Sequence, residues 1–304
     1  MSSSITSTPA LQRNIPLAPY TTLRIGGPAA YFAEPENEEA LVRLLAWAGR
    51  EGLSFFILGN GSNVIFEDAG YAGLVISMRR FRNDLITMDF ERLQVTVSAG
   101  VSLARLVRFC QESGLAGMEF LAQIPGTVGG ALVLNAGFSR HSGQLNEIGD
   151  LVLEVRALQQ DGTLVVLRRE DLKFSYRHSD LDPYLVLEAT LKLWRRPKEI
   201  IQNEMNANHD YRKVRQNITE PNAGSIFKNP PGGHPSAGVL IENAGLKGKR
   251  IGGIQVSGQH ANYFINKGNA TSQEVLQLLG EVQKAVFQTS GITLEPEIRI
   301  AKKN

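Results

Sequence analysis

The stretch Leu58 to Asn63, which reads Leu-Gly-Asn-Gly-Ser-Asn, constrains the fold more than any other part of the sequence. It lies between two short apolar runs, Ser54 to Leu58 and Val64 to Phe66, which we expect to be β-strands. A P-loop and a dinucleotide-binding turn both need a helix directly after the glycines, so neither is predicted. A glycine-rich turn between strands exposes backbone N–H groups that suit the oxygens of a diphosphate. A hairpin turn is the alternative.

Apolar periodicity predicts a chain in which helices and strands alternate, the pattern of α/β domains. The predicted helices are 38–50, 103–112, 198–214, 237–243 and 272–290, and the predicted strands are 54–58, 64–66, 74–77, 93–99, 151–158, 163–168, 184–194, 251–256, 263–266 and 294–300. Asp161-Gly162 is a hairpin motif between two of these strands. A chain of 304 residues exceeds the usual size of one domain. We place a boundary at the polar stretch that begins at Pro197.

Composition argues against several partners. The chain has 32 basic and 30 acidic residues, spread throughout, so no nucleic-acid surface is predicted. No apolar run approaches the roughly 20 residues of a membrane span. The single cysteine, Cys110, fits a reducing compartment, which we expect to be the cytoplasm, and its place on an apolar helix face predicts a core residue. The five histidines lack metal-ligand spacing, so no metal is expected. Residues 1–19 are expected to be a disordered or loosely packed lead.

The segment Pro221 to Pro230 places one hydroxyl, that of Ser225, between a glycine and the apolar pair Ile226-Phe227. Alone, such a segment predicts a turn. We nevertheless select Pro221 to Pro230 as the candidate catalytic centre, because three other stretches of the chain have features of a ligand-binding site.

Three other stretches offer exposed backbone or charged side chains that could contact a ligand. Ile124 to Ala131 has three glycines within five residues, which permits close approach of the chain, or a tight packing turn. Arg177 follows Tyr176, and a surface arginine stacked on the ring is the alternative interpretation. Glu297 and Arg299 are two residues apart and share one face of a predicted strand, which can also be a solvated ion-pairing face.

Together these stretches resemble the UDP-N-acetylenolpyruvoylglucosamine reductases, flavoproteins that make UDP-N-acetylmuramate for peptidoglycan. The resemblance runs from about Tyr20 to Ile300. Its motifs are Thr21 to Pro28, Leu58 to Asn63, Ile124 to Gly130, Tyr176-Arg177, Ala223 to Pro230, Ala244 to Gly248 and Glu297 to Arg299. The first three are shared with the wider family of FAD-binding domains in vanillyl-alcohol oxidase relatives. The later four narrow the resemblance to the reductases, in the shorter form without a tyrosine-bearing insertion.

The resemblance implies an α+β fold with two domains. Residues 20–197 would form a two-lobed FAD-binding domain of the vanillyl-alcohol oxidase type (PCMH-type), with lobes at about 20–78 and 79–197. Residues 198–304 would form a smaller C-terminal α/β substrate-binding domain. The cofactor would be non-covalent FAD, with NADPH as co-substrate, and we expect a monomer.

The resemblance also implies roles for individual residues. Arg177, Ser225 and Glu297 would be catalytic. The expected FAD-binding residues are Arg24, Ile25, Gly59, Asn60, Gly61, Ser62, Asn63, Ala99, Gly100, Ile124, Pro125, Gly126, Thr127, Gly129, Gly130, Asn135 and Gly137. The expected substrate-binding residues are Tyr176, Arg215, Asn229, His260 and Arg299. The sequence departs from the family pattern at Asn217, Phe138-Ser139, Gly232 to Ser236 and Ala301.

These roles fit the chemistry of an enolpyruvyl ether. Hydride addition to its alkene develops enolate charge, which Arg177 and a protonated Glu297 would stabilise, while Ser225 would donate the proton. One alternative is an FAD-dependent oxidase of a sugar or alcohol, which leaves the pattern around Ser225 unexplained. Another is a flavin-binding or nucleotide-sugar-binding protein without turnover, against which the presence of all three catalytic residues argues.

Overall fold

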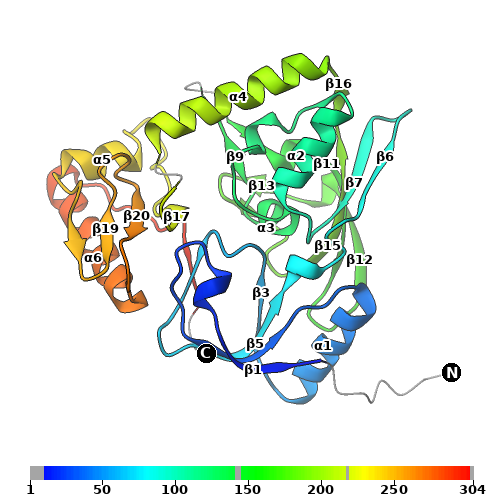
Figure 1. The fold of residues 1–304 in the computed structure, drawn as a ribbon, viewed down its shortest axis with the longest axis horizontal. Coiled ribbons are helices and arrows are strands. Elements are labelled where there is room, and N and C mark those ends of the chain that lie inside the picture. Colours follow the sequence, from blue (N-terminus) through cyan, green and yellow to red (C-terminus); the bar gives the residue numbers. More distant parts are fainter. Residues whose placement is uncertain (1–9, 141–144, 217–218, 302–304) are drawn as a thin grey trace. The chain divides into compact units, whose positions relative to one another are not determined.

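The computed structural model describes residues 10–140, 145–216 and 219–301 (Figure 1). Contacts within the chain divide it into two compact units. The first unit takes the chain up to residue 12, then 31–60 and 73–211, and the second takes 13–30, 61–72 and the chain from 212 on. Two short N-terminal segments therefore group with the C-terminal third, a division that differs from the expected consecutive segments.

A five-stranded antiparallel sheet forms the centre of the first unit, in the order β12-β11-β15-β7-β6. Its strands are β6 (Ile86–Asp89), β7 (Gln94–Ser98), β11 (Val152–Leu158), β12 (Leu164–Arg168) and β15 (Leu185–Lys192). Leu158 pairs with Leu164, so the chain reverses around Asp161-Gly162 and the predicted hairpin is confirmed.

Two helices lie over this sheet and complete its core (Figure 1). In α2 (Leu103–Glu112) the hydroxyl of Ser102 accepts a hydrogen bond from the backbone N–H of Arg105, which caps the helix start. The helix buries Leu106, Val107 and Cys110 against the sheet. Cys110 is only 1% exposed, which confirms that it is a core residue. The second helix is α3 (Val128–Val133).

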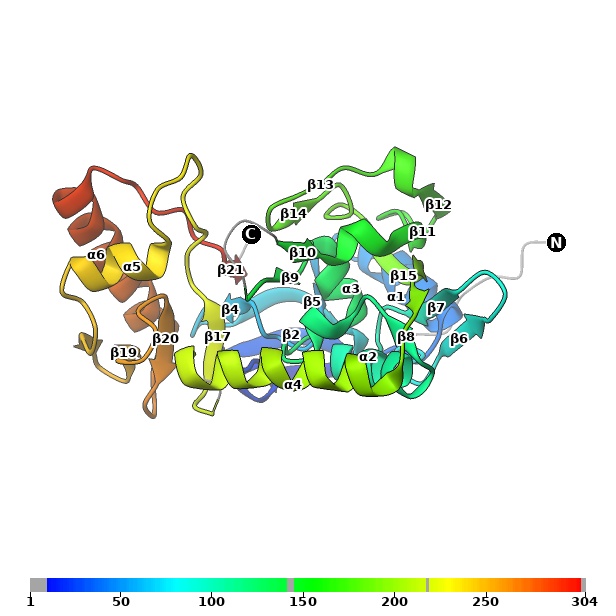
Figure 2. The ribbon, with the colours of Figure 1, turned by 90° about the horizontal axis from the view of Figure 1, so that it is seen from above.

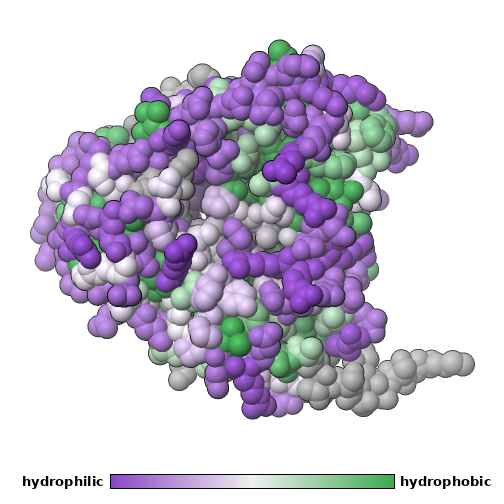
Figure 3. All heavy atoms as spheres, viewed as in Figure 1, coloured by the Kyte–Doolittle hydropathy of each residue, from purple (hydrophilic) through white to green (hydrophobic). Residues whose placement is uncertain are grey.

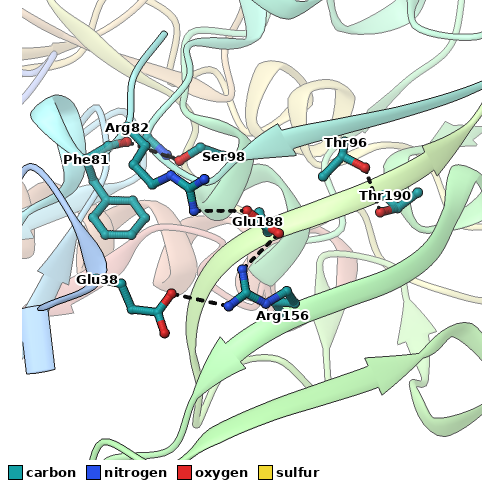
Figure 4. Close-up of polar contacts among 9 residues, drawn as sticks. Glu38, Phe81, Arg82, Thr96, Ser98, Arg156, Glu188 and Thr190 are labelled. Carbon is teal, nitrogen blue, oxygen red and sulfur yellow. Dashed lines mark hydrogen bonds and ion pairs between the residues drawn. The ribbon is translucent and has the colours of Figure 1, made fainter. Parts of the chain in front are cut away.

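Helix α1 (Glu38–Arg50) packs beside the parallel pair β3 (Phe55–Leu58) and β5 (Tyr71–Ser77). Its first residue, Glu38, belongs to an ion-pair network that ties the helix to the five-stranded sheet (Figure 4). Arg156 on β11 pairs with both Glu38 and Glu188 on β15, and Glu188 also pairs with Arg82. We call Glu38, Arg82, Arg156 and Glu188 the sheet cluster.

The second unit contains an antiparallel sheet in the order β17-β20-β19-β18, with α5 and α6 on one side (Figure 2). The elements are β17 (Asn222–Ser225), β18 (Arg250–Ile251), β19 (Ile254–Val256), β20 (Tyr263–Asn266), α5 (Ala237–Asn243) and α6 (Ser272–Ser290). A capping box of Thr271 and Glu274 begins α6, and Gly291, with φ of 70°, ends it. In the same unit β4 (Val64–Phe66) pairs in parallel with β21 (Arg299–Ala301).

Three expectations need correction. The predicted strand 251–256 is two strands, because Gly252 adopts φ of 52° and the chain reverses there. The predicted strand 294–300 begins only at Arg299, so Glu297 precedes it. The expected lead is shorter than residues 1–19, because β1 spans Gln12–Pro16 and Leu17 is fully buried, while residues 1–9 lie outside the described part.

The remaining elements complete the fold. They are β2 (Pro28–Ala33), β8 (Leu115–Ala116), β9 (Gly137–Phe138), β10 (Asn146–Glu147), β13 (Phe174–Ser175), β14 (His178–Ser179), β16 (Trp194–Arg195), α4 (Lys198–Arg215) and 3₁₀ turns at Ala18–Tyr20, Met78–Arg80, Glu119–Leu121, Ile148–Leu151 and Arg169–Asp171. Hydrophilic side chains dominate the face drawn in Figure 3. Among the described residues, no helix combines the length and apolar character of a membrane span.

Candidate functional site

The glycine-rich turn at 58–63 is not a hairpin. The strand before it, β3, pairs with β5, whereas the strand after it, β4, pairs with β21, and both pairings are parallel. The turn therefore joins two strands that do not pair with each other. This excludes the hairpin interpretation and leaves the turn as a candidate ligand loop.

Within the first unit, Gly59 lies against the second glycine-rich stretch. A Cβ added to Gly59 would stand 2.6 Å from the Thr127 hydroxyl oxygen, and one added to Gly129 would stand 2.9 Å from the Ala99 Cβ. The backbone N–H of Gly129 donates to the Ala99 carbonyl at 3.0 Å. The structure thus brings together four predicted FAD-binding residues, namely Gly59, Ala99, Thr127 and Gly129. A side chain at Gly59 or Gly129 would collide with its neighbour, so these two positions require glycine.

Thr127 organises the same stretch from the other side. Its hydroxyl accepts a hydrogen bond from the N–H of Gly130 and caps α3, while Val128 donates to the Val101 carbonyl. Pro125 and Gly130 are exposed. A Cβ added to Gly130 would have one neighbour within 4 Å, the Thr127 hydroxyl oxygen at 3.6 Å. A backbone surface with few side chains fits the close approach of a flat ring system or a diphosphate, so these residues fit FAD.

Arg177 lies at the second position of the two-residue loop between β13 and β14. Its φ is 58°, where a type II turn favours glycine, so the loop stores strain of roughly 1 kcal/mol or more. The guanidinium carbon lies 5.0 Å from the ring centroid of Tyr176, which confirms the stacked arrangement. Nη2 also donates to the Gly137 carbonyl at 3.2 Å. Loop and side chain are thus both fixed by neighbours.

The expected FAD-binding residue Asn135 supports the Arg177 loop. It is fully buried, with φ of 44°. Its side-chain amide donates to the Ser175 carbonyl and its amide oxygen accepts from the Gly149 N–H, both at 3.0 Å. Because these contacts are internal, its side chain holds the protein together around Arg177.

In the second unit a β-bulge sets the position of Ser225. Along β17, the pairing with β20 steps three residues, from Asn222 to Ser225, while the partner strand steps two. Gly224 supplies φ of 71°, and its N–H donates to the Asn222 side-chain oxygen at 2.9 Å. A bulge redirects the side chain that follows it. Gly224 thus allows the bulge that precedes Ser225.

Glu297 lies beside this bulge. Its N–H donates to the Ile226 carbonyl at 2.8 Å, and its carbonyl accepts from the Asn63 side-chain amide at 3.1 Å. The N–H of Arg299 donates to the Asn63 carbonyl at 3.1 Å. Two expected catalytic residues and one end of the glycine-rich turn therefore meet in this unit.

The second unit also holds the expected substrate residues Arg215, Asn229, His260 and Arg299, whereas Tyr176 lies in the first unit. The ring of His260 packs in a tilted arrangement against that of Tyr263, the pairing partner of Ser225, with ring centroids 5.0 Å apart. Burial lowers the pKa of His260, and its Nδ1 accepts from the N–H of Asn262 at 3.2 Å, as a neutral imidazole does. Asn229 uses its side-chain oxygen to accept from the N–H of Ala237, the first residue of α5.

Arg215 ends α4 with its side chain exposed. The Gln259 side chain donates to the Lys213 and Val214 carbonyls, which fastens the end of α4 beside His260.

Two expected cofactor residues contribute differently. Arg24 is exposed with φ of 57°, whereas Ile25 is 2% exposed within the apolar core, so only its backbone is available to a ligand. Gly61, Ser62 and Asn63 belong to the second unit, and a Cβ on Gly61 would stand 2.0 Å from the Tyr20 carbonyl oxygen. Arg177 belongs to the first unit and Ser225 to the second.

Our sequence analysis did not identify two residues that the structure places at these clusters. Asn262 is 3% exposed, accepts from the N–H of Phe227 and donates to the carbonyl of the same residue, which fixes the chain after Ser225. Glu147 pairs across β9 and β10 with Gly137. Asn262 stands between Ala261 and Tyr263, a weak sequence clue, whereas Glu147 follows Asn146 and has no such clue. Among the described residues, no group of three or more His, Cys, Asp or Glu side chains could hold a metal ion.

The chain matches two family models. Residues 29–168 match the FAD binding domain, and residues 216–301 match the C-terminal domain of UDP-N-acetylenolpyruvoylglucosamine reductase. These matches confirm the expected α+β fold class with its FAD-binding and C-terminal parts.

Relatives match over nearly the full length. The UDP-N-acetylenolpyruvoylglucosamine reductase of Moorella thermoacetica is 43% identical over 288 residues, covering 94% of this chain and 92% of the relative. That of Bacillus subtilis is 39% identical, covering 96% and 94%. The crystal structure of the reductase from Thermus caldophilus superposes with a TM-score of 0.81 at 36% identity, covering 96% of this chain and 99% of that one. The chain therefore belongs to the UDP-N-acetylenolpyruvoylglucosamine reductase family.

Proposed function

We propose that this protein uses NADPH to reduce UDP-N-acetylglucosamine enolpyruvate to UDP-N-acetylmuramate, a step of peptidoglycan precursor synthesis. The observation that carries the proposal is the bulge at Ser225 beside Glu297, in a chain of this reductase family. The Ser225 hydroxyl and a protonated Glu297 carboxyl group would supply the two donors that an enolate intermediate requires.

The first residues of the proposal hold the cofactor. Bound FAD would supply two-electron chemistry, taking hydride from NADPH and passing it to the substrate. We assign its binding to the close-packed stretch around Gly59, Ala99, Thr127 and Gly129, whose backbone admits a ligand closely. The remaining cofactor assignments, from Arg24 to Gly137, stand as part of the same proposal.

The catalytic residues act on the enolpyruvyl carboxylate and its neighbouring carbon. Negative charge grows on that carboxylate during reduction, and the Arg177 guanidinium stabilises it. Glu297, when protonated, donates a hydrogen bond to the same charge. Ser225 donates the proton to carbon, a task suited to a neutral donor that does not form an ion pair with the carboxylate.

Substrate binding falls to residues with complementary charge or shape. Arg215 and Arg299 suit the diphosphate and carboxylate of the nucleotide sugar. Tyr176, Asn229 and His260 complete the set. In the proposed organisation residues 20–197 bind FAD and residues 198–304 bind substrate, in a cytoplasmic monomer without nucleic-acid or membrane partners.

The test separates the two half-reactions. In anaerobic stopped-flow absorbance, NADPH should bleach the flavin of Ser225→Ala at nearly the normal rate. Reoxidation by the enolpyruvyl substrate should slow by orders of magnitude, about 10²-fold or more, because only that half needs the proton. Ser290→Ala, which removes a hydroxyl at the end of α6, is the matched control.

Equal losses in both half-reactions would remove the proton-donor role from Ser225. A wild-type flavin that stays bleached until air is admitted would instead favour an FAD-dependent oxidase of a sugar or alcohol.

A further inference from the structure

We propose that Glu147 is a positioning residue for Arg177, and that its carboxylate balances the guanidinium charge until the substrate carboxylate arrives. The inference rests on the proposed function, because it gives Arg177 a substrate to bind. Glu147 does not contact the substrate carbons that receive the hydride and the proton. It acts by positioning Arg177.

Gly137 lies between the two side chains. It pairs with Glu147 across β9 and β10, and a Cβ added to it would stand 2.8 Å from the Glu147 Cγ. Its carbonyl accepts the hydrogen bond from Arg177 Nη2 at 3.2 Å. A shift of the Glu147 side chain would therefore move Gly137, whose carbonyl accepts the hydrogen bond from the Arg177 guanidinium.

Asn135 links the same elements. Its side chain hydrogen-bonds the Glu147 carboxylate, the N–H of Gly149 and the Ser175 carbonyl. Ser175 stands two residues before Arg177, and Gly149 two residues after Glu147. One fully buried amide thus fixes the distance between the strand that carries Glu147 and the loop that carries Arg177.

The charges at Glu147 favour a role towards Arg177. Burial raises the pKa of Glu147 above its ordinary value, the Asn135 hydrogen bond and Arg177 lower it, and Asp150 raises it. Within the part of the chain that the structure describes, its buried Oε1 has no hydrogen-bond partner. A purely structural carboxylate is usually fully hydrogen-bonded, whereas this one is held close to a cation and is incompletely satisfied.

The experiment compares Glu147→Gln with wild type and with Asp150→Asn, which removes an exposed carboxylate three residues away. In the anaerobic reoxidation of NADPH-reduced enzyme by enolpyruvyl substrate, Glu147→Gln should lower the limiting rate about tenfold or more. The apparent substrate dissociation constant should not rise, because the variant loses a competing negative charge. Flavin reduction by NADPH should stay unchanged, and the thermal midpoint should not fall.

Two further readouts separate positioning from simple damage. The acid limb that Glu147 ionisation gives to the wild-type reoxidation rate should be missing in Glu147→Gln, and Glu147→Asp should restore part of the rate. Calorimetric binding of UDP-N-acetylmuramate, which needs no turnover, should be equal or tighter in Glu147→Gln. Asp150→Asn should keep the wild-type limiting rate and product affinity and should retain the acid limb, moved to lower pH because Asp150 no longer raises the pKa of Glu147.

The inference is overturned if Glu147→Gln keeps the wild-type limiting rate, or if it weakens product binding together with a lower thermal midpoint. Should Glu147→Gln fail to fold, Glu147→Asp decides by the same rate and pH profile. Failure of the proposed function shows itself separately, as a wild-type enzyme that the enolpyruvyl substrate does not reoxidise.

Discussion

Two arginine–glutamate clusters of the first unit differ in how fully their charges are satisfied. In the sheet cluster, Glu188 accepts from Arg82 at 3.1 Å and from Arg156 at 2.9 Å, and Arg156 reaches Glu38 at 3.3 Å (Figure 4). Around Arg177, by contrast, Glu147 leaves one carboxylate oxygen buried without a hydrogen-bond partner among the described residues.

Arginine and glutamate therefore have different roles in the two clusters. Mutual pairing in the sheet cluster fixes α1, β11 and β15, and it raises the pKa of Arg156 through the Glu188 hydrogen bond. Incomplete pairing near Arg177 coincides with backbone strain at φ of 58°. Strain and unsatisfied polar groups concentrate where proteins bind ligands, so we expect substitutions in the two clusters to separate stability from catalysis.

The largest expected effect comes from Arg177→Lys. Lysine keeps the charge but lacks the planar pair of donors, so reoxidation by the enolpyruvyl substrate should fall by about 10²- to 10³-fold. The free energy of unfolding should change little. Anaerobic stopped-flow absorbance measures the rate and urea unfolding the stability.

The matched substitution in the sheet cluster is Arg156→Lys. It should leave the reoxidation rate nearly unchanged and lower stability by about 1 kcal/mol. If both lysine variants lost activity equally, the distinction between the clusters would fail.

A stability effect of intermediate size is expected for Glu188→Ala. Its side chain is 14% exposed and is shared by two arginines, so its removal should lower the free energy of unfolding by about 2 kcal/mol. Glu38→Ala serves as the comparison, because that side chain is 33% exposed and should cost less than about 1 kcal/mol. Urea midpoints that rank the two variants in the opposite order would argue against a central role for Glu188.

The smallest effect concerns the pH dependence of stability. Because burial raises the pKa of Glu147 in the folded state, the folded protein holds this proton more tightly than the unfolded chain does. The stabilising contribution is present below the ordinary value of 4.5 and is lost as pH rises through the raised pKa. Relative to Glu147→Gln, the wild type should therefore lose stability over that interval. A difference in urea midpoints that is independent of pH would contradict the assignment.

Local sequence patterns predicted the longer elements because local physics decides them. The helix over 38–50 has an Asn37 cap and a buried stripe, and the Asp161-Gly162 turn suffices to define its hairpin. The prediction for 251–256 was wrong because Gly252-Gly253 forms a two-residue hairpin loop between Ile251 and Ile254, and the predicted strand ran across it. A Gly-Gly pair between apolar residues is a hairpin signal that the pattern of apolar residues alone does not show.

The site was predictable only in part for a different reason. Glycine clusters and the residues Arg177, Ser225 and Glu297 stand out in the sequence, but their supports do not. Asn135 was expected to bind the cofactor, yet its side chain joins Gly149 to Ser175 within the protein. Such contacts depend on segments that meet only after folding, and no spacing in the sequence encodes them.

The parallel pairing of β4 with β21 has a consequence for synthesis. On the ribosome, β4 emerges about 235 residues before its partner strand exists, which at 5–20 residues per second is on the order of tens of seconds. All three residues of β4 are buried in the finished protein, and Phe66 and Ile65 fully so. The nascent chain therefore exposes an apolar segment through most of translation, and this segment stays open to non-native contacts until β21 has been made.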